Sequence, residues 1–239
     1  MLEQHQFLER HAWALGTLAL ITVSIGGIVE IVPTFTIETT VEHVKGVRPY
    51  TPLEQAGRDI YVREGCYLCH SQMIRALKDE VERYGHYSLA AESMYDHPFQ
   101  WGSKRIGPDL SRVGGKYSND WHYAHLTNPQ ALVPESLMPH YAFLAENDLR
   151  YGDIGDKLRT LRTLGVPYSE QQVKDAVKDL EAQANAQTDV AAFDKKYPKA
   201  AIASGDGHRV SEMDALVAYL QVLGTMVNFA DTSEESLRQ

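Results

Sequence analysis

The most informative stretch of this chain is Cys66-Tyr67-Leu68-Cys69-His70. Its two thiols are spaced so that they can add across the vinyl groups of a haem while the adjacent imidazole reaches the iron. Two other kinds of site share part of the pattern. A C-x-x-C redox disulfide normally lies in a βαβ unit, and a zinc site needs four ligands, although the chain has only two cysteines. The motif therefore predicts one covalent haem c on Cys66, Cys69 and His70.

A haem iron bound by His70 takes a sixth ligand, and Met138 is the best candidate for it. This residue lies in Val133-Pro134-Glu135-Ser136-Leu137-Met138-Pro139, where two prolines favour an extended backbone that can present a thioether opposite the imidazole. A thioether ligand is typical of electron carriers, whereas an open site would indicate oxygen or peroxide chemistry. The histidines that remain as alternative ligands are His122, His125 and His140.

The turn Ile106-Gly107-Pro108-Asp109-Leu110 is a candidate partner of the imidazole. A carbonyl oxygen that accepts the second ring N–H of a ligating histidine fixes its tautomer and raises its basicity. Pro108 can offer a carbonyl with no competing N–H. We therefore expect Pro108 beside His70, with an ordinary surface turn as the alternative.

Residues 13–35 form an apolar stretch with a single charge, Glu30, and are long enough to cross about 30 Å of hydrocarbon as a helix. The stretch is long for a cleaved signal peptide, and neither a basic leading region nor a clear small-x-small cleavage site accompanies it. The sequence predicts an uncleaved anchor. Its small and polar residues Ala19, Thr22, Gly26 and Glu30 recur on one stripe, which either packs against another helix or faces lipid by chance.

The haem motif also decides the direction of insertion. Residues 1–12 carry Arg10 against Glu3 and Glu9, so the distribution of positive charge specifies the orientation poorly. Cytochrome c maturation takes place outside the bacterial inner membrane. We therefore expect residues 1–12 in the cytoplasm and everything after residue 35 in the periplasm.

The rest of the sequence predicts a mainly α-helical domain. Residues 36–52 read as a periplasmic tether, residues 53–230 as the haem domain and residues 231–239 as a frayed tail. Inside the domain, 71–103 is a polar insert, and 146–199 is an unassigned helical region. The helices expected are one that starts at Thr51 or Pro52, then 120–127, 142–162, a charged surface stretch within 168–199, and 211–223, which Ser211 caps and Gly224 ends.

Charge narrows the possible partners. The chain of 239 residues has 32 acidic and 23 basic side chains, a formal charge of −9, and no long basic run. A phosphate backbone requires such a run, so we expect no nucleic-acid partner. An acidic face could steer a basic soluble electron carrier, or could serve solubility alone.

Beyond the haem motif, several longer stretches are distinctive together. They are Ile28-Val29-Glu30-Ile31-Val32-Pro33, Gly46-Val47-Arg48-Pro49-Tyr50-Thr51-Pro52-Leu53-Glu54, Gly57-Arg58-Asp59-Ile60-Tyr61, 66–75, 79–102, Gly107-Pro108-Asp109-Leu110 and Pro134-Glu135-Ser136-Leu137-Met138-Pro139. On these stretches, between Gly27 and about Tyr141, the sequence resembles the mono-haem cytochrome c subunit (subunit II) of cbb3-type cytochrome c oxidases. These are the haem-copper terminal oxidases of many bacteria.

The resemblance implies a single transmembrane helix followed by a class I cytochrome c-like periplasmic domain with insertions. It implies His70 and Met138 as axial ligands, and Cys66 and Cys69 as thioether sites. Electrons would come from a di-haem cytochrome c subunit or a soluble cytochrome c and pass to haem b of the catalytic subunit. The complex would be the proton-translocating enzyme, whereas this chain only carries electrons. The sequence departs from the family at Ala76-Leu77, and region 146–199 matches no motif of it.

Two other functions fit part of the pattern. The small cytochrome c subunit of a nitric oxide reductase has a similar anchor and haem, but the long aromatic insert at 79–102 favours the oxidase. A free-standing, membrane-anchored shuttle cytochrome would have a long flexible tether and a featureless anchor helix, and neither fits well.

Overall fold

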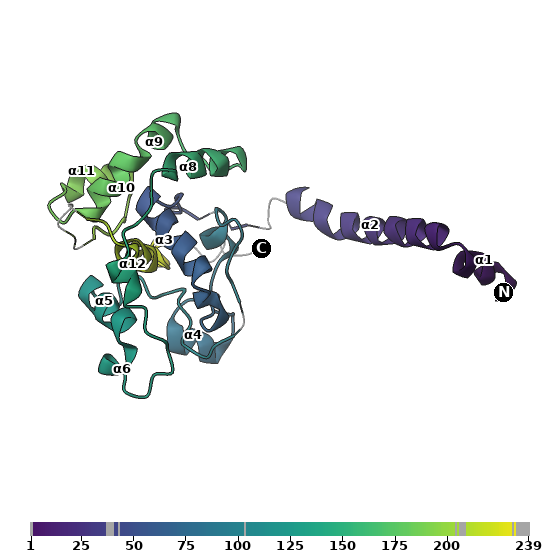
Figure 1. The fold of residues 1–239 in the computed structure, drawn as a ribbon, viewed down its shortest axis with the longest axis horizontal. Helices are drawn as coiled ribbons and strands as arrows, with labels where there is room; N and C mark the ends of the chain where they lie inside the picture. The colour runs from purple at the N-terminus through teal and green to yellow at the C-terminus, as the bar shows by residue number, and fades with distance from the viewer. Residues whose placement is uncertain are drawn as a thin grey trace. The chain divides into compact units, whose positions relative to one another are not determined.

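The computed structural model describes residues 2–36, 41–42, 44–102, 104–203, 205, 209–230 and 232. The chain divides into two units, one of residues 1–42 together with residue 239 and one of residues 43–238, and each is described by itself (Figure 1). The regular elements of the described residues are helices, and one isolated antiparallel bridge joins Asp148 to Ser211. The prediction of a mainly helical fold with one apolar N-terminal helix is confirmed.

The first unit consists of α1 (Leu2–Arg10) and α2 (Ala12–Thr36). Its segment Ala12–Pro33 is long and apolar enough to cross a membrane, and its side chains are mostly exposed. The helix continues through Pro33 to Thr36, one residue beyond the end of the predicted anchor. On the small-residue stripe, the hydroxyl of Thr22 donates to the Leu18 carbonyl of its own helix at 2.8 Å. Parts of the predicted tether (37–40 and 43) and most of the predicted tail lie outside the described residues.

Two capped helices form the centre of the second unit. Helix α3 (Pro52–Arg63) begins at the N-cap Thr51, which forms a capping box with Glu54, as the sequence predicts. Helix α12 (Glu212–Val222) begins at Ser211, whose side chain forms the same motif with Asp214. Each box satisfies N–H groups that a helix start leaves without partners, and the acidic first turns suit the positive end of the helix dipole.

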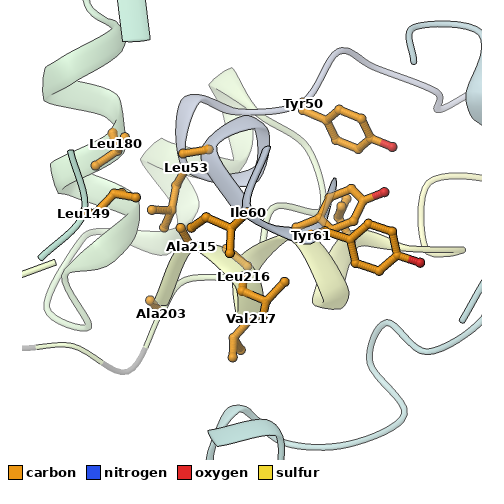
Figure 2. Close-up of a cluster of buried hydrophobic side chains, with 14 of the residues drawn as sticks. Tyr50, Leu53, Ile60, Tyr61, Leu149, Leu180, Ala203, Ala215, Leu216 and Val217 are labelled. Carbon is orange, nitrogen blue, oxygen red and sulfur yellow. The ribbon is translucent and has the colours of Figure 1, made fainter. Parts of the chain in front are cut away.

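Helices α3 and α12 cross at very short distance because α3 carries a glycine at the crossing. A Cβ at Gly57 would lie 1.8 Å from the Ala215 carbonyl oxygen and 2.9 Å from the Tyr219 Cβ. Beside the crossing, the ring of Tyr219 lies 5.3 Å from that of Tyr61 and 5.6 Å from that of Tyr50, in tilted and edge-on arrangements. Figure 2 shows Ile60 of α3 beside Leu216 of α12, and both side chains belong to the buried core.

The other helices surround this pair. They are η2 (Cys66–Leu68), α4 (Lys78–Tyr84), η3 (Ala90–Ser93), α5 (Asn119–Thr127), α6 (Pro129–Leu132), α7 (Phe143–Glu146), α8 (Ile154–Thr163), α9 (Glu170–Lys174), α10 (Ala176–Ala184) and α11 (Val190–Lys196). The short elements of the insert and helix α5 agree with the sequence analysis. In Figure 1, α8–α11 lie together on one side of α3, whereas α5 lies beside α12 and α6 packs on α5.

The single helix expected over 142–162 is wrong. Helices α7 and α8 are separate because the chain between them pairs with the residues before α12. Leu149 donates its N–H to the Val210 carbonyl at 2.9 Å, and Glu212 donates to the Asn147 carbonyl at 3.1 Å. Two extended segments that exchange hydrogen bonds cannot also continue a helix, so a long-range contact overrides the local helical pattern.

Region 146–199 packs into the same hydrophobic core as α3, the helix that precedes the haem motif. Its buried side chains, among them Leu158 and Leu180, pack with α3 residues such as Leu53. Polar contacts add to this packing, because the Thr51 hydroxyl donates to the Gln183 side chain and Lys157 Nζ lies 3.0 Å from an Asp59 oxygen. The charged stretch within 168–199 is therefore exposed on one face only. Its buried face packs against the beginning of α3.

Candidate haem site

The two cysteines and His70 lie in one tight turn at the end of α3. Gly65 follows α3 with a left-handed backbone (φ +69°), and the 3-10 turn η2 begins at Cys66. The carbonyl of Cys66 then accepts the N–H of Cys69 at 3.2 Å and that of His70 at 2.9 Å. These bonds hold both thiols and the imidazole on a compact piece of chain that is anchored to the packed helix α3.

The thiol of Cys66 lacks the lowered pKa that a redox disulfide centre needs. Cys66 and Cys69 are both free, the first half-buried and the second exposed. Burial, with a smaller effect of the Glu64 carboxylate, raises the pKa of the Cys66 thiol to about 12. A C-x-x-C centre for thiol exchange needs a lowered thiol pKa, because the thiolate is the nucleophile. The raised pKa of Cys66 argues against that alternative.

The imidazole of His70 has one nitrogen engaged. Its Nδ1 lies 2.8 Å from the Pro108 carbonyl oxygen, where it can donate an N–H, and this tautomer leaves Nε2 as the free acceptor. The preceding residue allows the approach, because a Cβ at Gly107 would lie 2.2 Å from the His70 Cε1. The Gly107 N–H donates to the Cys69 carbonyl at 3.0 Å and completes the contact between the two segments.

Met138 lies half-buried in a loop that packs against the core. The side-chain amide of Gln130, on α6, donates to the carbonyls of Ser136 at 2.8 Å and Met138 at 3.0 Å. The hydroxyl of Ser136 in turn accepts the Met138 N–H at 3.2 Å. These hydrogen bonds hold the backbone of the loop that carries Met138. The sequence analysis missed Gln130, since no local pattern connects it to the methionine loop.

The three alternative histidines have different environments. His122 is buried on α5, where desolvation and the neighbouring His125 lower its pKa to about 4. Burial lowers the pKa of His125 as well, and His70 is the second cause, so α5 places His125 near His70. His140 is exposed.

The residues present fit a c-type haem. The donor set is two free thiols, an imidazole with Nε2 available and a thioether, which is the set that attaches and ligates such a haem. Apolar side chains accompany it, because Leu68 and Leu137 lie in the same segments as Cys69 and Met138 and expose 52% and 87% of their surface. Such side chains suit the apolar face of a macrocycle better than they suit water.

Comparison with known protein families assigns nearly the whole chain to one family. A family model described as "Cytochrome C oxidase, mono-heme subunit/FixO" matches residues 5–227, which is nearly the entire sequence. The match includes the haem motif, the Met138 loop and region 146–199. A search among curated proteins gives no match.

Proposed function

Because the chain belongs to the family of mono-haem subunits of cytochrome c oxidase, we propose that it carries single electrons through one covalent haem c to haem b of the catalytic subunit of a cbb3-type oxidase. The family implies one haem and association with a catalytic oxidase subunit. The observation that carries the finer proposal is the turn at Cys66–His70, where the imidazole Nδ1 is bound by the Pro108 carbonyl and Nε2 is left free.

Each residue of the site has a defined part in this proposal. Cys66 and Cys69 would hold the haem by thioether bonds, and His70 and Met138 would ligate the iron. Pro108 would orient His70, and Gln130 would orient the Met138 loop. The haem supplies the reversible one-electron couple, whereas the protein fixes the ligands and thereby the potential. With His70 and Met138 both bound to the iron, no position would be left for oxygen. Oxygen reduction would therefore take place in the catalytic subunit of the proton-translocating complex.

Location follows from the same chemistry. Helix α2 would anchor the chain in the bacterial inner membrane, with residues 1–12 in the cytoplasm and the haem domain in the periplasm. The electron donor would be a di-haem cytochrome c subunit or a soluble cytochrome c. The family match favours the oxidase over a nitric oxide reductase or a free shuttle cytochrome.

Two substitutions test the ligands. His70→Ala should abolish stable holoprotein, because it removes the proximal ligand from the attachment motif. Met138→His should keep the haem attached and lower its reduction potential, since imidazole is the stronger donor. Redox titration of the purified protein measures the second effect. An unchanged potential in Met138→His would remove Met138 from the coordination sphere and point to His122, His125 or His140.

Purification of the native complex tests the assignment to an oxidase. We expect this chain to co-purify with a membrane subunit that contains copper and with cytochrome c oxidase activity. A copper-free complex that reduces nitric oxide, or a chain that purifies alone with full haem, would favour one of the two alternative functions.

A further inference from the structure

The function proposed above gives no role to the buried carboxylate of Asp109, which follows Pro108 in the segment that binds His70. The side chain of Asp109 is fully buried beside Pro108. One of its oxygens accepts the Ser71 hydroxyl at 2.6 Å and the Met73 N–H at 3.0 Å, and the other accepts the Ser111 N–H at 2.8 Å. A buried carboxylate with three donors is well satisfied, so its cost of burial is offset by charge-assisted hydrogen bonds.

Arg105 connects the same groups from the other side. Its guanidinium lies 3.5 Å from Asp109 and donates to the Ser71 hydroxyl at 2.7 Å and the Met73 carbonyl at 2.9 Å. It also donates to Glu80 at 2.7 Å, and its hydrogen bond is the main reason that the pKa of Glu80 falls to about 2. Arg75 pairs with Glu80 as well, so two guanidinium groups balance two carboxylates here. Removal of the Asp109 charge therefore leaves a local excess of positive charge.

The contacts of Asp109 join the segment after His70 to the segment that contains Pro108. Two backbone bonds connect the same segments, from Gly107 N–H to the Cys69 carbonyl at 3.0 Å and from Leu110 N–H to the Ser71 carbonyl at 2.9 Å. Since a single Cβ at Gly107 would collide with the imidazole, the separation of the segments is tightly set. The Asp109 carboxylate lies between the two segments. It accepts the Met73 N–H of one segment and the Ser111 N–H of the other.

We propose that Asp109 is a positioning residue that holds the Pro108 carbonyl on the His70 Nδ1–H and thereby lowers the reduction potential of the haem. The proposal rests on the proposed function, because it requires His70 to ligate a haem iron. A firm hydrogen bond to Nδ1–H makes the imidazole more basic and favours the ferric state. The negative charge of Asp109 acts in the same direction, since ferric haem carries one more positive charge than ferrous haem.

The test is Asp109→Asn in the full-length holoprotein. Asparagine keeps the shape but can accept at one oxygen only, so its amide must face either the Ser111 N–H or the Ser71 and Met73 donors. We expect the equilibrium constant for reduction to rise about tenfold, which is about 59 mV for one electron. We also expect the Nδ1 proton of His70, observed by NMR, to exchange faster with solvent, and a role in charge alone would not change that rate.

Two further variants complete the experiment. Asp79→Asn makes the same change of charge at an exposed residue of α4, so it should leave both measurements close to wild type. Ser71→Ala removes the 2.6 Å hydrogen bond but keeps the charge of Asp109, so it should accelerate proton exchange and shift the potential less.

Three outcomes would overturn the inference. One is that Asp109→Asn binds haem but changes the potential and the proton exchange no more than Asp79→Asn does. Another is that Asp109→Asn binds no haem and Ser71→Ala does so with wild-type values, which would assign Asp109 to folding alone. Absence of haem from the wild-type and Asp79→Asn chains would contradict the proposed function and this inference with it.

Discussion

At the scale of single residues, helix α5 places a histidine where its charge is unfavourable. His122 is 3% exposed, and its Nε2 is buried without a hydrogen-bond partner among the described residues. Desolvation, and then His125, lower its pKa from 6.5 to about 4. Folding therefore favours the neutral imidazole, and any protonation of His122 has to be driven against the fold.

The pKa of His122 predicts a loss of stability in mild acid. Above pH 6.5 the residue is neutral in both states, and its contribution is fully favourable. As the pH falls from 6.5 to 4, the unfolded chain binds a proton that the folded chain does not, so the free energy of unfolding decreases. We expect His122→Leu to reduce the loss between pH 7 and pH 4.5 by about 2–3 kcal/mol, measured by urea unfolding of the holoprotein.

The exposed residue His140 provides the control for this measurement. His140→Asn should show the same loss between pH 7 and pH 4.5 as the wild type. Equal losses in His122→Leu and wild type would show that the imidazole of His122 titrates as it does in the unfolded chain.

At the scale of elements, the α3–α12 crossing supports the haem motif. Helix α3 leads directly into the Cys66 turn, and α12 covers its buried face. At the C-terminal end of α3, the guanidinium of Arg63 donates two hydrogen bonds to the carboxylate of Glu212 on α12, at 2.7 and 2.9 Å. The position of the cysteines relative to the core therefore depends on how closely these two helices approach.

Gly57→Ala should separate the two helices. The added methyl group would overlap the Ala215 carbonyl, which is backbone and cannot rotate away. Overpacking of this kind typically costs about 1–3 kcal/mol, and we expect a destabilisation at or above the upper end, measured by chemical denaturation. Haem retention should fall with it. Gly152→Ala is the matched control, because nothing lies within 4 Å of a Cβ at that position. A stability equal to that of Gly152→Ala would mean that the helices can relax apart at no cost.

At the scale of the whole molecule, the anchor and the haem domain are separate units. The main core cluster contains residues from Tyr50 to Met226 and includes the inner faces of α8 and α10. Haem motif, methionine loop and region 146–199 therefore share one core. This organisation makes region 146–199 part of the folding unit rather than an appendage of it.

Residues 36–239, exported to the periplasm without the anchor, should therefore fold as a soluble low-spin cytochrome. The core contacts, the α3–α12 crossing and the proposed haem ligands all lie within this fragment. The measurement is the absorption spectrum of the purified fragment together with its covalent haem content. The fragment must be exported to a periplasm where cytochrome c maturation is active. If it takes up no haem there, the core requires the membrane-embedded partner.

The features that could be predicted from the sequence are those whose information is local. The Cys66–His70 spacing, the caps Thr51 and Ser211, and the apolar stretch of α2 each depend on residues close together in the chain. The other features depend on contacts that form only in the folded protein. The tertiary structure separated α7 from α8, placed region 146–199 on α3, and brought Gln130 and Asp109 to the candidate site. These features arise from hydrogen bonds and packing between segments far apart in the chain, which no local periodicity encodes.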